Sequence, residues 1–102
     1  MRARLFAYRG AMHKRLGRLE EAEADLQIAQ RHASRSYEVD DVTYNLAGVF
    51  ALQGNRDKLL AAVSQLSKES RHMMAIRAHL NDYFRAFRDD EEFLRIIGEP
   101  VA

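Results

Sequence analysis

The side chains in this sequence that could do chemistry are four histidines and a run of acidic residues. The histidines are His13, His32, His72 and His79. Only His72 and His79 would share a helix face, and seven residues of helix would separate them by about 10.5 Å along the axis. Two imidazoles at that distance cannot share a zinc ion, because each bond to zinc is only about 2 Å long. We therefore expect no metal site and no cofactor.

The acidic run from Asp89 to Glu92 has a structural explanation. A calcium loop needs oxygen ligands at alternating positions with a glycine bend, and this run lacks that pattern. Asp89, with Glu92 three residues later, has the spacing of a helix capping box. The chain also contains no cysteine, no nucleophile elbow and no glycine-rich phosphate loop. We expect that the protein is not an enzyme.

Length and composition narrow the class of protein further. The chain has 102 residues, the size of one domain, and 47% of them are hydrophobic and 30% charged. One proline and five glycines are few, which favours helices over a β-sandwich or barrel. No apolar run is long enough to span a membrane, and the N-terminus lacks the apolar core of a signal peptide. We therefore expect a cytoplasmic location.

Apolar residues recur at spacings of three and four, which predicts helices and no strand. Six helical segments follow from this pattern, at about 5–19, 19–33, 39–50, 59–66, 73–87 and 93–97. Gly17 and Gly54 are expected to end helices, and Asn55 to cap the helix that follows. Asp40 and Asp41 are the expected caps of the third helix. The fold class is therefore expected to be all-α, with antiparallel neighbours because the connections are short.

Two segments of the chain repeat each other at a period of 37 residues. Residues 6–22 and 43–59 match by residue type, and Gly17 aligns with Gly54. Each segment consists of a helix, a glycine turn and the start of a second helix. A period of this length is typical of a helical solenoid, whose units cannot bury their apolar faces alone.

The segment from Tyr8 to Ala29 resembles the tetratricopeptide repeat. The residues that carry the resemblance are Gly10, Gly17, Ala22, Leu26 and Ala29. The second unit matches at Leu46, Ala47, Phe50, Gly54, Val63 and Leu66, with Leu59 in place of a small residue. The tail from Asp82 to Leu94 is similar to the closing unit of bacterial tetratricopeptide arrays. The resemblance implies an antiparallel helix-hairpin solenoid of about three units, at about 3–36, 40–70 and 72–98.

The resemblance also implies a protein–protein interaction module or scaffold. Its concave face, lined by the first helix of each unit, would bind a peptide or helix of a partner. The expected partner-binding residues are Arg9, His13, Asn45, Val49, His79 and Tyr83. Some family members clamp the C-terminal carboxylates of a partner, but only Asn45 matches that clamp, so this specific function is not implied.

Two other interpretations start from residues 1–18, which contain six basic residues and no acidic one. A solenoid end leaves an apolar stripe exposed unless something covers it, so the chain would self-associate through this end or stack head to tail. On a helical wheel the basic residues Arg4, Lys14, Arg15 and Arg18 lie opposite the apolar residues Leu5, Tyr8, Met12 and Leu16. That basic face would be solvated, or would neutralise the phosphates of a nucleic acid.

Overall fold

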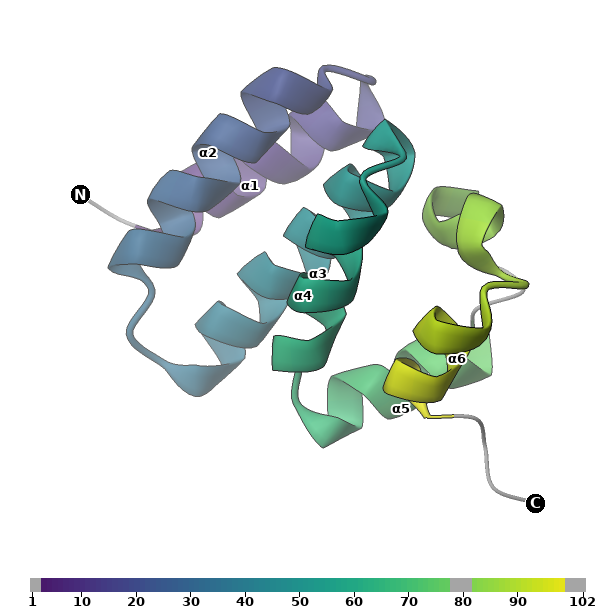
Figure 1. Ribbon diagram of the computed structural model, residues 1–102. Coiled ribbons are helices and arrows are strands. Elements are labelled where there is room, and N and C mark those ends of the chain that lie inside the picture. Colours follow the sequence, from purple (N-terminus) through teal and green to yellow (C-terminus); the bar gives the residue numbers. More distant parts are fainter. Residues whose placement is uncertain (1–2, 78–81, 99–102) are drawn as a thin grey trace.

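All the regular structure in the described part of the chain is helical. The computed structural model describes residues 3–77 and 82–98, and no strand occurs among them. The elements are α1 (Ala3–Arg15), α2 (Leu19–His32), α3 (Ser36–Gln53), α4 (Arg56–Gln65), α5 (Lys68–Arg77), the 3-10 helix η1 (Asp82–Phe87) and α6 (Glu91–Ile97). Consecutive helices pack as hairpins, α1 with α2 and α3 with α4, while α5, η1 and α6 gather at the other end (Figure 1). Within the described ranges no helix is long and apolar enough to cross a membrane.

The two hairpin turns follow the local chemistry that the sequence predicts. Gly17 and Gly54 adopt φ angles of 77° and 72°, in the left-handed region that glycine enters without steric cost. The backbone N–H of Gly54 donates to the carbonyl of Ala51, which closes the end of α3. The side chain of Asn55 then accepts a hydrogen bond from the N–H of Lys58 and caps α4. Both glycine turns and the asparagine cap are confirmed.

The first hairpin depends on a close approach between α1 and α2. A Cβ atom placed on Gly10 would lie 2.6 Å from Cγ of Leu26 and 3.3 Å from the carbonyl oxygen of Ala22. Leu26 and Ala22 are fully buried. The absence of a side chain at position 10 is therefore what lets the two helices pack at this distance.

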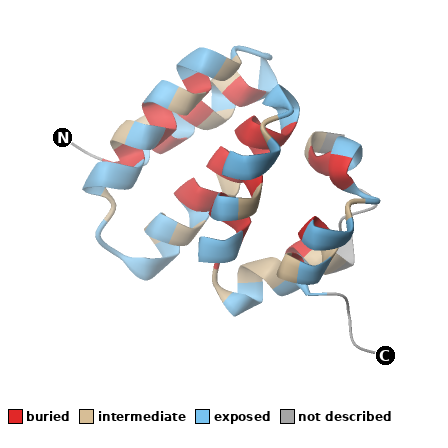
Figure 2. Ribbon diagram, in the orientation of Figure 1, coloured by how far each residue is buried: buried red, intermediate tan, exposed pale blue. Residues whose placement is uncertain are grey.

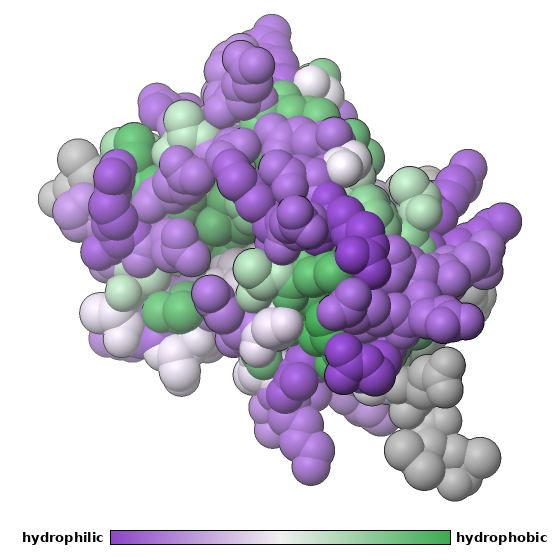
Figure 3. All heavy atoms as spheres, viewed as in Figure 1, coloured by the Kyte–Doolittle hydropathy of each residue, from purple (hydrophilic) through white to green (hydrophobic). Residues whose placement is uncertain are grey.

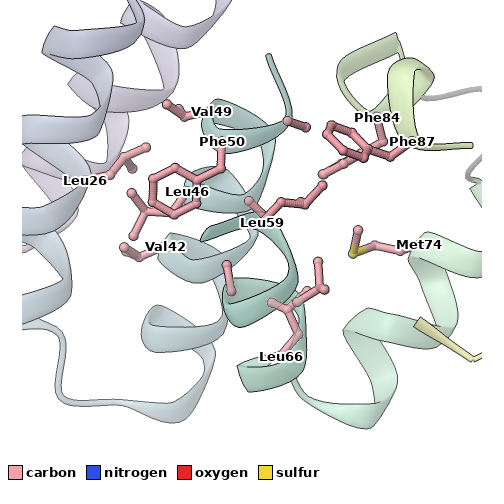
Figure 4. Close-up of a cluster of buried hydrophobic side chains, with 14 of the residues drawn as sticks. Leu26, Val42, Leu46, Val49, Phe50, Leu59, Leu66, Met74, Phe84 and Phe87 are labelled. Atoms are coloured by element: carbon pink, nitrogen blue, oxygen red, sulfur yellow. The ribbon is translucent and has the colours of Figure 1, made fainter. Parts of the chain in front are cut away.

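A single hydrophobic core runs through all the helices. Figure 2 shows the buried residues on the facing sides of α1 to α4. Leu26 of α2 meets Leu46 and Phe50 of α3, and Phe84 and Phe87 of η1 lie on the opposite side of the second hairpin (Figure 4). The rings of Phe84 and Phe87 lie 5.8 Å and 6.3 Å from the ring of Phe93 in α6. Contacts among these phenylalanines pack η1 and α6 against the core.

The region expected to form one helix from 73 to 87 is two separate elements. Helix α5 starts earlier than expected, at Lys68, and η1 covers 82–87 as a 3-10 helix; residues 78–81 lie outside the described residues. Helical spacing alone does not distinguish one long helix from two short ones in line. The prediction of a single fifth helix was therefore wrong.

Asp40 has a different role from the expected one. Because α3 begins at Ser36, Asp40 lies inside this helix and does not cap it. Its carboxylate accepts hydrogen bonds from the N–H and hydroxyl of Ser67, at 2.7 and 2.9 Å, and from the hydroxyl of Ser70. Burial raises the pKa of Asp40, but these hydrogen bonds outweigh that effect and hold the pKa below its usual value. Asp40 thus fastens the start of α5 to α3.

The cap of α6 is displaced by one residue from the predicted position. Asp90 accepts a hydrogen bond from the N–H of Phe93 at 3.1 Å, whereas Asp89 is exposed. Asp90 is held in place by Arg56, whose Nε lies 2.8 Å from its carboxylate. The ion pair with Arg56 of α4 therefore determines which of the two adjacent aspartates caps α6.

Helix α1 presents a different face to the core from the one its hydrophobic pattern suggests. Its buried residues are small apart from one lysine: Ala3, Ala7, Gly10 and Lys14. The apolar residues Leu5, Tyr8, Met12 and Leu16 are all exposed. The prediction of a solvated basic face was wrong for Lys14, which is only 5% exposed. Close packing against α2 explains this orientation, since only the small-residue face of α1 can approach that helix so closely.

We predict that Gly10→Ala lowers the stability of the protein although alanine is the better helix former. Overpacking costs about 1–3 kcal/mol and the gain in helix propensity offsets about 1 kcal/mol of it. Urea denaturation followed by circular dichroism measures the net loss. In the background of Leu26→Ala, which removes the Cγ and Cδ2 atoms that a Cβ at position 10 would meet, the same substitution should cost less. A Gly10→Ala variant more stable than the wild type would contradict the close approach of α1 and α2.

Candidate partner-binding site

A groove of about 500 Å³ lies between α1 and the first turns of α3. Ala3 and Ala7 of α1 and Val42 of α3 line it with buried apolar surface. The two alanines are short, so the groove stays open between the helices. Both helices are the first members of their hairpins.

Aromatic and charged side chains complete the lining of this groove. Tyr8 of α1 and Tyr37 of α3 contribute large, exposed rings. Arg4 contributes a positive charge, and Glu38 and Asp41 contribute two negative charges. Tyrosine offers apolar contact area together with a hydroxyl that can form hydrogen bonds, a combination enriched at protein interfaces.

Further along α1 and α3, one end of Lys14 is enclosed among polar and aromatic groups. Its ammonium donates a hydrogen bond of 2.7 Å to Oδ1 of Asn45, whose amide in turn donates to the carbonyl of Asp41. The nitrogen also lies 4.4 Å from the ring centre of Tyr83 and 5.9 Å from that of Tyr44. The lysine, the amide and the two rings thus join α1, α3 and η1.

Burial of Lys14 has an electrostatic consequence. Loss of hydration disfavours the charged ammonium, the neighbouring charge of Arg15 acts in the same direction, and Asp41 opposes them. Together these effects lower the pKa of Lys14 to about 8. Near neutral pH the folded protein therefore holds a lysine that gives up its proton far more readily than an exposed one.

A second polar cluster joins α1 to α2. Arg9 forms two hydrogen bonds to the carboxylate of the buried Asp25, at 2.7 and 2.8 Å. The hydrogen bonds from Arg9 hold the pKa of Asp25 below its usual value, and the positive charge of the guanidinium adds to this effect. The imidazole of His13 lies between Asp25 and Glu21, with a distance of 3.6 Å to each carboxylate. This cluster therefore holds the first hairpin together.

The expected partner-binding residues are divided among several environments. Asn45 and Tyr83 come together at Lys14, and Arg9 and His13 come together at Asp25. Val49 is fully buried and contributes to the core, so its expected place on a binding face was wrong. His79 lies outside the described residues.

Sequence reasoning did not select the residues that line the groove. Tyr8 belongs to the apolar residues expected to face the core, and Tyr37 lies between the second and third predicted helical segments. The short residues Ala3 and Ala7, four apart on α1, are the feature of the sequence that could have indicated the groove. They mark a helix face where another helix, or a ligand, can come close.

Comparisons of the chain with protein-family models, with curated proteins and with solved structures find no match. Within the described ranges, no group of three or more histidine, aspartate or glutamate residues is placed to hold a metal ion. The chemistry of the groove is therefore inferred from its own residues.

We predict that Lys14 makes stability depend on pH in the alkaline range. Between about pH 8 and 10 the folded protein releases this proton while the unfolded lysine keeps it, so stability rises with pH. Relative to Lys14→Met, the wild type should gain about 2 kcal/mol between pH 7 and 9.5. Urea denaturation at a series of pH values measures the difference.

The matched control for this measurement is Lys68→Met, since Lys68 is exposed at the start of α5. Its stability difference from the wild type should stay constant over the same pH range. A difference between wild type and Lys14→Met that is also independent of pH would show that Lys14 is not buried as described.

Proposed function

We propose that this chain is a tetratricopeptide-like interaction module whose groove between α1 and α3 binds a short segment of a partner protein. The groove itself is the observation that supports this proposal: it is open, about 500 Å³ in volume, and lined by both apolar and charged side chains. Binding sites for peptides commonly combine apolar contact with a few polar groups that fix orientation.

We further infer that the two hairpins are successive units of one repeat. At the 37-residue offset, Gly10 corresponds to Ala47, and both are buried residues of the first helix of a hairpin. Leu26 corresponds to Val63, and both are fully buried in the second helix. This correspondence supports the relation to tetratricopeptide repeats, in which the first helices of successive units lie next to each other.

The charges in the groove indicate the chemistry of the bound segment. Glu38 and Asp41, one turn apart on α3, outnumber Arg4. A segment with an apolar side chain over Ala7 and Val42, followed by a lysine or arginine near the two carboxylates, complements this arrangement.

Binding of nucleic acid through α1 has less support. Lys14 is buried, and Arg9 is engaged by Asp25. Of the four basic residues expected on such a surface, Lys14 is thus enclosed within the protein, which leaves Arg4, Arg15 and Arg18 to contact phosphates.

We predict that the groove selects short peptides with both apolar and basic residues from a random peptide library displayed on phage. Fluorescence anisotropy with the selected synthetic peptides then gives their affinities. Glu38→Arg should weaken binding by about tenfold or more, because it replaces attraction by repulsion. Glu91→Arg is the control, because Glu91 also lies in the first turn of a helix, α6, and is exposed outside the groove.

Two results would overturn the proposal. One is a library that yields no peptide bound above background. The other is a set of peptides that bind Glu38→Arg as tightly as the wild type.

A further inference from the structure

The exposed side of α1 carries a stripe of large apolar residues: Leu5, Tyr8, Met12 and Leu16. Their spacing of three, four and four residues places them along one face of the helix, opposite the buried Ala3, Ala7 and Gly10. Leu5 is 64% exposed and Met12 60%. By contrast, hydrophilic side chains cover most of the face formed by α2 and α4 (Figure 3). We call these four residues the α1 stripe.

The second hairpin shows how the same face is covered when a neighbour is present. At the 37-residue offset, Leu5 corresponds to Val42 and Met12 to Val49, and these valines are 2% and 0% exposed. Both point from α3 toward the first hairpin (Figure 4), whose helix α2 packs along α3. The residue that corresponds to Leu16 is Gln53, and its amide donates a hydrogen bond of 3.1 Å to Glu23 of α2. This face of α3 is therefore covered jointly by α1, whose Lys14 bonds Asn45, and by the acidic amphipathic helix α2.

The charges beside the α1 stripe favour an occupant of the same kind. Arg4 and Arg15 lie beside the stripe and not, as was expected from the helical wheel, opposite it, because Arg4 precedes Tyr8 by four residues and Arg15 follows Met12 by three. Both arginines are exposed, and neither forms an ion pair with another described residue. Helix α1 has no acidic residue. If two copies of the chain paired through their α1 helices in antiparallel fashion, Arg4 of one copy would lie near Arg15 of the other, and like charges at an interface disfavour association.

We propose that the α1 stripe is the docking site of a partner protein's amphipathic helix with acidic residues beside its apolar face. The partner helix would lie along α1 as α2 lies along α3, with its carboxylates toward Arg4 and Arg15. The stripe lies on a different face of α1 from Ala3 and Ala7, and it shares only Arg4 and Tyr8 with the lining of the groove. Leu5, Met12, Arg15 and Leu16 belong to the stripe and its flank alone.

Two synthetic peptides of about 16 residues, held helical by a hydrocarbon staple, test this proposal. Both carry leucines at the spacing of the stripe, with glutamates beside them in one peptide and lysines in the other. In fluorescence anisotropy the glutamate peptide should bind with an affinity at least about tenfold higher than that of the lysine peptide. Its binding should weaken as the salt concentration rises toward about 0.5 M, because the flanking charges are exposed.

Substitutions with matched controls assign the binding to the stripe. Met12→Ser should weaken binding of the glutamate peptide about tenfold or more, because an exposed apolar contact is lost, whereas Met73→Ser, at an exposed methionine of α5, should not. Arg15→Glu should also weaken it, whereas Arg31→Glu, likewise in the last turn of a helix, should not. The groove variant Glu38→Arg should bind this peptide as the wild type does, which separates the two proposals.

Two results would overturn this inference. Equal affinity for the two peptides would show that charge does not select the occupant. A wild-type dimer in sedimentation that Met12→Ser dissociates would show that a second copy of the chain covers the stripe.

Discussion

The close approach of α1 and α2 at Gly10 is the contact on which the rest of the structure depends. Leu26 fills the space that a side chain at position 10 would need, and Arg9 of α1 binds Asp25 beside it. This contact orients α1 so that its smallest residues face inward. The same orientation places Lys14 between α1, α3 and η1. There Asn45 accepts a hydrogen bond from its ammonium, and burial lowers the pKa of the lysine.

A second consequence follows on the opposite side of α1. Once the small residues face inward, the large apolar residues Leu5 and Met12 must face outward. In the second hairpin the equivalent face of α3 is covered by α1 and α2, so one type of surface is present twice, once covered and once open. The groove and the α1 stripe are therefore two products of the same packing. The short side chains of Ala3 and Ala7 leave the groove open toward α3. The large apolar side chains on the other side of α1 form the stripe.

The sequence predicted the features that depend on a few adjacent residues. Gly17, Gly54 and Asn55 are examples, because left-handed turns and helix caps are decided by local backbone geometry. The cap of α6 was predicted one residue too early, at Asp89, because the choice of Asp90 as the cap depends on its ion pair with Arg56 in another helix. The inward turn of Lys14 was not predicted either. A helical wheel shows two faces of α1, and the more hydrophobic one is ordinarily buried, whereas here the fit of Gly10 against Leu26 decides the orientation. The groove was not predicted in detail since it needs the relative placement of α1 and α3.

The reactivity of single cysteines tests the central claim most directly, because the chain contains none of its own. Met12→Cys and Val49→Cys place a thiol at equivalent positions of the two hairpins, one exposed and one fully buried. With Ellman's reagent, Met12→Cys should react at nearly the rate of a free thiol, and Val49→Cys at least about a hundredfold more slowly, because it reacts only when the structure opens. Similar rates for the two thiols, or slow reaction of Met12→Cys, would contradict the account of a helix face that is covered in the second hairpin and open in the first.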